Sequence, residues 1–435
     1  MAAGYFCVLF DQGFMPVVTP LLPFGVNNSV WLTSVFLLCS VAPMPAAGRM
    51  GDAYGQRRMF LVGLAITAAA LLLGAASWSF GALVFARALQ GIGVALFLPQ
   101  AFGLIPRVLP PERHGRAFAV WGIVGSIASL LGPVLGGAIA QAQGWRAGFL
   151  LQAALCLIAL AATAAWVPRL PVSGARVPLV PVLLSLAGLG ALVYGIQFGN
   201  WVGVLVGAIS LAALLIAART GEDQGFLPLH LFRERTFALG TVGVTTMGFA
   251  AASMFIPLMY WLQTAAGASP STAGLIAAPM SVLALVATPV AGHLTDTADP
   301  RMLCITGFCV QAAGLALAAG LILLGAAPGW FAIATALLGL GSACVWAPNA
   351  AITMRRIPPS DAGAASGLYN TVRQVGSVVG VALVGAVLAA GKIEDTAAFA
   401  LALPLGAFVV GGVSAALLGP IPAGGASTAS GHASR

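Results

Sequence analysis

Charged residues are scarce in this chain. Asp, Glu, Lys and Arg make up 7% of its 435 residues, and histidine occurs only four times. The sequence shows neither paired carboxylates with catalytic spacing nor a His and Cys cluster with metal-ligand spacing. The six cysteines all lie in apolar runs, which favours packing over disulfide or metal chemistry. We therefore expect no enzyme, no metal and no other cofactor.

Apolar sequence dominates instead. The chain is 60% hydrophobic with a mean hydropathy of +1.00, and its apolar runs repeatedly reach the ~20 residues needed to cross a bilayer. A net charge of +8 could suit nucleic acid, but the arginines lie in short loops between these runs and form no basic face. We therefore expect the lipid bilayer as a partner and no nucleic acid. Because Met1 is followed by neither a basic segment nor a cleavage site, we expect an uncleaved first span.

The apolar runs predict an all-α polytopic membrane protein with about fourteen transmembrane helices. These are residues 2–24, 30–48, 59–77, 80–104, 117–140, 147–167, 178–197, 199–218, 237–262, 271–291, 302–325, 329–352, 363–390 and 397–418. The longest gap, Arg219–Thr236, is expected to be a cytoplasmic segment with a short surface helix.

The basic residues predict the orientation. Arg146 and Lys392 fall on one side of this map, and Arg87 and Arg373 lie within spans. The remaining fifteen of the nineteen Lys and Arg residues fall on the other side. Because positive charge marks the cytoplasmic side, both termini should be cytoplasmic and the protein should lie in the cell (inner) membrane.

Internal repeats predict the domain organisation. Pro45–Asp52 recurs as Pro289–Asp296, and Pro110-Pro111 recurs as Pro358-Pro359. We expect a six-helix bundle at 1–167, two inserted helices and a linker at 168–236, a second six-helix bundle at 237–418 and a disordered cytoplasmic tail at 419–435. Parallel repeats of this kind suit a transporter that rocks one half against the other.

One acidic residue, Asp11, falls inside a predicted span rather than in a loop or at a span end. An intramembrane carboxylate suggests a proton or cation site. Burial disfavours its ionised form and a nearby cation favours it, so it could bind and release a proton. The alternative is a structural aspartate paired permanently with another helix.

Arg87 is the matching cation, and it needs a partner or a wet cavity. It opens a segment that contains Gln90, Gly91 and Gly93. We expect it to couple to Asp11, although it could simply hold helices together. In the next helix, small residues at three- and four-residue steps predict tight packing, with a bend at a proline; the group comprises Gly132, Pro133, Gly136 and Gly137.

The polar segment Gly48–Arg58 lies between two apolar runs and is expected to form a tight cytoplasmic loop. Its glycines allow helix ends to approach and supply positive φ for a turn. Its candidate residues are Gly48, Asp52, Gly55, Arg57 and Arg58, with Asp296 in the weaker second copy. The alternative is that this loop only fixes topology.

Other polar and aromatic residues in the spans are candidates for a substrate cavity, although such residues more often serve packing. They are Trp121, Gln152, Trp346, Asn349, Tyr369 and Asn370. Arg373 and Gln374 lie in the predicted helix 363–390, which corresponds in the second half to the predicted helix 117–140. Arg373 could face the cavity or pair across the bundle. No second carboxylate lies deep in a span, which argues against divalent cations as cargo.

These motifs resemble those of a known family. Gly48–Arg58 is similar to the loop-2/3 signature of the major facilitator superfamily, and Arg87–Gly93 to its helix-4 signature. Gly132–Gly137 resembles the helix-5 motif of antiporters. Across nearly the whole chain, the resemblance is to fourteen-helix drug/proton antiporters of the EmrB/QacA type. It implies proton-driven export of small, hydrophobic or cationic compounds, with Asp11 at the family's helix-1 acidic position.

Other functions stay open at this point. A carrier for uptake or facilitated diffusion would use the same fold, and a membrane-embedded enzyme would need the catalytic groups that are missing. A non-transporting scaffold or receptor is disfavoured because an intramembrane Asp and two Arg suit passive packing poorly. We expect a monomer whose partners are a small-molecule substrate and protons.

Overall fold

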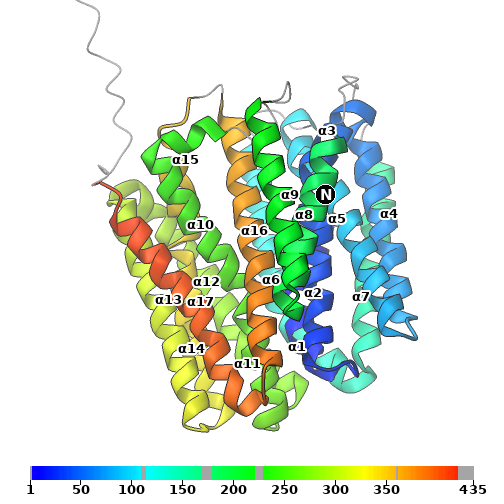
Figure 1. The fold of residues 1–435 in the computed structure, drawn as a ribbon, viewed down its shortest axis with the longest axis vertical. Helices are drawn as coiled ribbons and strands as arrows, with labels where there is room; N and C mark the ends of the chain where they lie inside the picture. Colours follow the sequence, from blue (N-terminus) through cyan, green and yellow to red (C-terminus); the bar gives the residue numbers. More distant parts are fainter. Residues whose placement is uncertain (1, 109–113, 168–178, 221–228, 359–360, 420–435) are drawn as a thin grey trace, which may run out of the picture.

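The computed structural model describes residues 2–108, 114–167, 179–220, 229–358 and 361–419, and within these ranges all regular structure is helical (Figure 1). The first part contains α1 (Ala2–Val18), η1 (Thr19–Leu21), α2 (Val26–Val41), α3 (Met44–Tyr54), α4 (Gln56–Ala75), α5 (Phe80–Val108), α6 (His114–Gln143), α7 (Trp145–Trp166), α8 (Leu179–Phe198) and α9 (Trp201–Thr220). The second contains η3 (Leu229–Arg233), α10 (Arg235–Ser253), α11 (Phe255–Tyr260), η4 (Trp261–Ala265), α12 (Pro270–Thr297), α13 (Pro300–Leu323), η5 (Pro328–Trp330), α14 (Phe331–Ala343), α15 (Trp346–Met354), α16 (Ala362–Ala389) and α17 (Ile393–Ala416).

Ten of the described helical segments are long and apolar enough to cross a membrane. Shorter apolar stretches occur in α2, α8 and α9, and α1 has 17 residues. Each of the fourteen predicted helices coincides with one of these segments. The all-helical, multi-pass prediction is therefore confirmed, whereas a total of fourteen spans stays a prediction.

Prolines break three of the predicted helices. A proline lacks the N–H group that would bond to the carbonyl four residues earlier. Accordingly α2 ends at Val41, four residues before Pro45; α10 ends at Ser253, four before Pro257; and α14 ends at Ala343, five before Pro348. The continuous helices predicted at 30–48, 237–262 and 329–352 were therefore wrong in this detail. The first helix likewise ends at Val18, and η1 follows it.

Helix starts follow from local chemistry. Gly25, Gly55 and Gly144 precede α2, α4 and α7 with φ of 75°, 97° and 82°, values that residues with a Cβ rarely adopt. Ser269 and Asp299 accept hydrogen bonds from the first-turn N–H groups of Thr272 and Arg301 and so cap α12 and α13. These starts set the direction of each helix across the molecule.

The same four helix pairings occur in both parts of the chain. α1 packs on α6, α2 on α5, α4 on α5 and α4 on α7; correspondingly α10 packs on α16, α12 on α14, α13 on α14 and α13 on α17. The two groups meet through α6 against α12 and α2 against α16 (Figure 1). This repeated pairing is what the sequence repeat predicts, while the domain boundaries themselves stay a prediction.

The α8–α9 hairpin lies where the two groups meet. α8 contacts both α2 and α16. Gln197 of α8 accepts a hydrogen bond from Ser34 at 2.8 Å and donates one to the Asn27 carbonyl at 3.0 Å, so the hairpin is fixed to α2. Ser185 also donates to the Ala42 carbonyl, at 3.3 Å.

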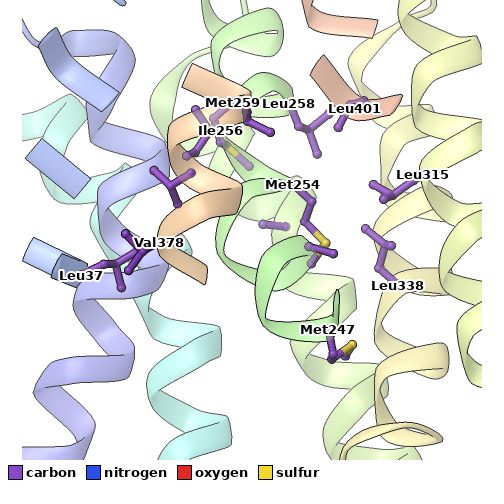
Figure 2. Close-up of a cluster of buried hydrophobic side chains, with 14 of the residues drawn as sticks. Leu37, Met247, Met254, Ile256, Leu258, Met259, Leu315, Leu338, Val378 and Leu401 are labelled. Carbon is purple, nitrogen blue, oxygen red and sulfur yellow. The ribbon is translucent and has the colours of Figure 1, made fainter. Parts of the chain in front are cut away.

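The largest buried cluster joins the two groups. Leu37 of α2 lies next to Val378 of α16, and three methionines, Met247, Met254 and Met259, continue the cluster through the second group (Figure 2). Methionine is unbranched and fills irregular gaps between helices. This interface therefore depends largely on adaptable apolar contacts.

The segment Gly48–Arg58 is helical rather than a loop. Gly48–Tyr54 belongs to α3, Gly55 makes the turn, and α4 begins at Gln56. Only Gly55 therefore supplies the positive φ that was expected of the glycines. Within the predicted linker, η3 is a short helical turn, and residues 221–228 and the tail from 420 lie outside the described residues.

Candidate transport site

Asp11 of α1 and Arg87 of α5 form an ion pair in the interior, with exposed fractions of 1% and 0%. Nη1 of Arg87 lies 2.8 and 3.0 Å from the two carboxylate oxygens of Asp11. The same nitrogen donates to Oε1 of Gln90 at 2.7 Å, and Nε2 of Gln90 donates to Asp11 at 3.2 Å. The three side chains close a ring of hydrogen bonds, which compensates for burying both charges.

The remainder of the guanidinium faces α2. Nε donates to the Leu32 carbonyl at 3.3 Å, and Cζ lies 4.4 Å from the centre of the Phe36 ring. Nη2 is buried and has no hydrogen-bond partner among the described residues. Arg87 is thus held by groups from three helices, α1, α2 and α5.

Two glycines make this arrangement possible. A Cβ atom at Gly91 would lie 2.6 Å from the Phe36 carbonyl oxygen, and one at Gly93 would lie 2.8 Å from the Gly63 carbonyl oxygen. Real Cβ atoms essentially never come that close, so these positions let α5 pack directly on α2 and α4. Close packing brings Arg87 within reach of Asp11.

A cavity of about 490 Å³ lies between the two helix groups, in the range that accepts drug-sized ligands. Asp11 and Arg87 contribute to its wall from one side, and Trp346, Arg373 and Gln374 from the other. Much of the remaining lining is apolar, with these further polar or phenolic groups: Tyr5, Gln12, Thr33, Ser126, Ser129, Ser281, Thr288, Ser342 and Ser377. The predicted charge pair and part of the predicted cavity are therefore in one place.

Four of the residues suggested for the cavity have other surroundings. Asn349 is buried and donates to the Gly240 carbonyl and to the Tyr369 hydroxyl, both at 3.0 Å, so these two side chains tie α15 to α10 and α16. Gln152 is buried and donates within its own helix to Gly148. Asn370 is exposed and donates within its own helix to Ser366. The side chain of Trp121 lies outside the described residues.

Sequence reasoning missed several cavity groups. Ser126 and Ser129 of α6 line the cavity, but small residues in a membrane helix commonly serve packing and so do not stand out in the sequence. Tyr5 and Ser281 gave no signal, because single hydroxyl groups in apolar helices commonly serve packing or back-bonding. Which side chains face the cavity depends on helix rotation, which the sequence pattern does not set.

The small residues of α6 make close contacts on two sides. A Cβ at Gly132 would lie 2.7 Å from the Phe10 carbonyl oxygen, and one at Gly136 would lie 2.7 Å from the Phe14 ring. On the opposite group, Gly137 packs directly against the Pro270 carbonyl, and Gly274 of α12 against that of Pro133. α6 is therefore the helix that joins α1 to α12.

The segment Gly48–Arg58 packs against α5 and α7. Gly51 lies directly against the side chain of Gln100, which donates to the Ala47 carbonyl at 2.6 Å. Arg57 donates to the Ala164 carbonyl at 2.8 Å, whereas Arg58 is exposed. A Cβ at Gly48 would meet open space. The side chains of Asp52 and Asp296 lie outside the described residues, so the roles suggested for them stay predictions.

The two groups are held together at the end of the molecule that carries α11 (Figure 1). There Gln263 donates to the Val17 carbonyl at 2.9 Å, Tyr260 to the Thr19 carbonyl at 3.4 Å, and Ser271 N–H to Gln141 at 3.4 Å.

The sequence matches the family model described as Major Facilitator Superfamily over residues 1–256 and 241–434. The chain belongs to the major facilitator superfamily. It is therefore a transporter and not an enzyme, as the sequence predicted. The paired helix groups and the cavity between them are the parts of that fold.

Relatives within the superfamily include drug-export proteins. The chain is 34% identical over 403 residues to an uncharacterised MFS-type transporter of Mycobacterium tuberculosis, covering 89% of this chain and 69% of that one. It is 31% identical over 426 residues to the tetracenomycin C resistance and export protein of Streptomyces glaucescens, covering 91% and 76%. It is 28% identical over 409 residues to a multidrug resistance protein of Mycobacterium tuberculosis, covering 89% and 74%.

The fold also matches solved transporters. An auto-inhibited POT family peptide transporter superposes with a TM-score of 0.71 at 16% identity, covering 97% of this chain and 98% of that one. At this identity the likeness concerns the fold alone. The family match and the apolar helices make the chain a multi-pass membrane transporter.

Proposed function

We propose that this transporter is a proton-coupled antiporter that exports small hydrophobic compounds across the cytoplasmic membrane by alternating access. The observation that carries the proposal is the buried ring of Asp11, Arg87 and Gln90, in which Asp11 and Arg87 line the cavity. Among the described side chains lining the cavity, Asp11 is the carboxylate that a transported proton could use. The direction of transport rests on relatives named for resistance and export.

The ring gives protonation a mechanical consequence. As long as Asp11 is ionised, charge attraction holds α1 against α5. When Asp11 takes up a proton, the attraction is lost, but Arg87 keeps the Gln90 side chain and the Leu32 carbonyl as acceptors. Because these fallback partners lie on α5 and α2, Arg87 stays with those helices while α1 is free to shift.

The packing of α6 supports a rocking motion. The contacts of Gly137 with Pro270 and of Gly274 with Pro133 close the α11 end. With the orientation expected from the basic residues, the α3 end would face the cytoplasm, and closure of the α11 end would suit a cytoplasm-facing state. Export would then separate these contacts and close the α3 end.

Proteoliposomes with an imposed pH gradient test this function. Ethidium and 8-anilinonaphthalene-1-sulfonate are fluorescent hydrophobic compounds with permanent charges of opposite sign, so neither follows a pH gradient by itself. With an acidic lumen, we expect at least one of them to accumulate while the lumen becomes alkaline. Accumulation that ignores the gradient, or none of either dye, would reject proton-driven export; protein-free liposomes provide the background.

A further inference from the structure

The charges around the cavity do not balance. Asp11, Arg87 and Arg373 are the ionisable Asp, Glu, Lys and Arg side chains among its lining residues. Asp11 and Arg87 neutralise each other at 2.8 Å. Arg373 of α16 has no acidic side chain within ion-pair distance among the described residues. The cavity therefore carries one uncompensated positive charge.

Apart from Asp11, the carboxylates of the described side chains lie elsewhere. Glu234 lies 3.4 Å from Arg356, and Asp361 lies 3.5 Å from His230. Asp299 caps α13, and the remaining two, Glu394 and Asp395, lie in the first turn of α17. Each of them sits at a helix end. None is placed to neutralise a cation halfway along α16.

The surroundings of Arg373 are aromatic. Its guanidinium carbon lies 5.8 Å from the centre of the Trp346 ring, within the range of a cation–π contact. Tyr5 lines the same cavity and adds another aromatic ring to its wall. Nε of Arg373 is buried and has no hydrogen-bond partner among the described residues. An arginine fork with an unsatisfied donor beside flat aromatic rings matches a planar organic acid.

We infer that the transported compounds are amphipathic organic anions, with an aromatic or apolar body and a carboxylate or similar acidic group bound by Arg373. This inference rests on the proposed transport function and names its substrate class. The acidic group pairs with the guanidinium, and the body packs against Trp346 and the apolar wall. A cationic compound would meet repulsion from Arg373, and Asp11 is already occupied by Arg87 and Gln90.

This assignment narrows the expectation from the sequence, which allowed hydrophobic or cationic compounds. The hydrophobic part is retained, since residues such as Leu9, Phe255 and Met280 line the cavity. The expected charge of the substrate changes from positive to negative. Arg87 and Gln90 already bind Asp11, whereas Arg373 has no acidic partner among the described residues.

Binding of a size-matched pair of compounds to the purified full-length protein tests the inference. 2-Naphthoate and 2-naphthylmethylammonium share one ring system and differ in the sign of their charge at about pH 7. Isothermal titration calorimetry in nonionic detergent should show 2-naphthoate binding at least about tenfold more tightly, as expected of a charge-assisted hydrogen bond in a protein interior. Arg373→Lys should keep the order of affinities, and Arg373→Gln should abolish it.

Arg146 offers a matched control. Its guanidinium also lies over a tryptophan, 4.2 Å from the Trp145 ring, but it does not line the cavity. Arg146→Gln should therefore leave the tenfold preference unchanged. Equal or tighter binding of the ammonium compound, binding of neither compound, or a preference that survives Arg373→Gln would overturn the inference. If Arg373→Gln does not fold, the wild-type comparison and Arg373→Lys still decide it.

The outcome is separable from that of the proposed function, because the titration uses no membrane and no gradient. A protein that prefers 2-naphthoate but moves nothing under a pH gradient would uphold the anion site and reject the antiporter. A protein that exchanges ethidium for protons and prefers the ammonium compound would support the antiporter and reject the anion site.

Discussion

Nη1 of Arg87 reaches both carboxylate oxygens of Asp11, 76 residues away in the sequence, from a site where both side chains are almost fully buried. The pair therefore links α1, which packs on α6, to α5, which packs on α2 and α4. A change in the charge of Asp11 therefore alters the attraction between α1 and α5 in the interior of the first helix group.

Removing the cation should destabilise the protein. In Arg87→Ala, Asp11 is left buried beside Gln90 without a positive charge, which typically costs about 3–5 kcal/mol. Arg87→Lys keeps the charge but loses the planar fork that also reaches Gln90 and Leu32, so its cost should be smaller. Thermal melting in detergent should rank wild type above Lys and Lys above Ala; equal melting of Ala and wild type would show that the pair adds no stability.

The glycine of α6 that faces α12 should matter for the transport cycle. A methyl group in Gly137→Ala would collide with the Pro270 carbonyl, so the α11 end could not close as it does here. We expect a transport rate at least about tenfold lower with preserved expression, because backbone carbonyls yield little to an added methyl group. Gly320→Ala in α13 is the control, since nothing lies within 4 Å of its added Cβ. Similar rates for the two variants would mean that this contact is not part of the cycle.

Asn349 should act on stability and leave substrate preference unchanged. Asn349→Ala removes the donor to Gly240 and Tyr369 from a buried site, which should cost about 1–3 kcal/mol. The exposed Asn370→Ala serves as the control and should melt close to wild type. A changed ratio of 2-naphthoate to 2-naphthylmethylammonium affinity in Asn349→Ala would instead show that Asn349 takes part in substrate binding.

The all-helical, multi-pass fold and the order of its helices could be predicted from sequence, because long apolar runs have few other stable arrangements. The interruptions of the helices could have been predicted as well, because Pro45 and Pro257 lie four residues after a helix end and Pro348 lies five residues after one. The rule is not general, since Pro133, Pro279 and Pro404 remain inside helices. Neighbouring helices decide which prolines are tolerated, and these neighbours are invisible in one sequence.

The candidate site was predicted in part for a similar reason. Asp11 and Arg87 stood out because buried charge is rare in a span and must have a partner. Asn349 and Tyr369 carry the same kind of polar group as the cavity residues. They are not among the residues that line the cavity, and Asn349 donates a hydrogen bond to the Tyr369 hydroxyl. Sequence shows the chemistry of a side chain, whereas its direction depends on how each helix is rotated in the bundle.

Topology provides an independent check of the orientation. Reporter fusions after Gln143, at the end of α6, and after Arg219, near the end of α9, should report opposite sides of the membrane, with the second cytoplasmic. The same side for both would contradict the expected fourteen-span map. It would also remove the assignment of this structure to a cytoplasm-facing state.

The central claim, that Asp11 carries the proton, is tested most directly by Asp11→Asn in proteoliposomes. The substitution keeps the volume and a hydrogen-bonding side chain while removing titration, so the protein should fold and still bind substrate. The measurement compares accumulation of 8-anilinonaphthalene-1-sulfonate under an acid-inside gradient with its exchange across the membrane when no gradient is present. We predict that Asp11→Asn loses gradient-driven accumulation and retains exchange; accumulation at the wild-type rate would show that Asp11 is structural and that this site does not carry the proton.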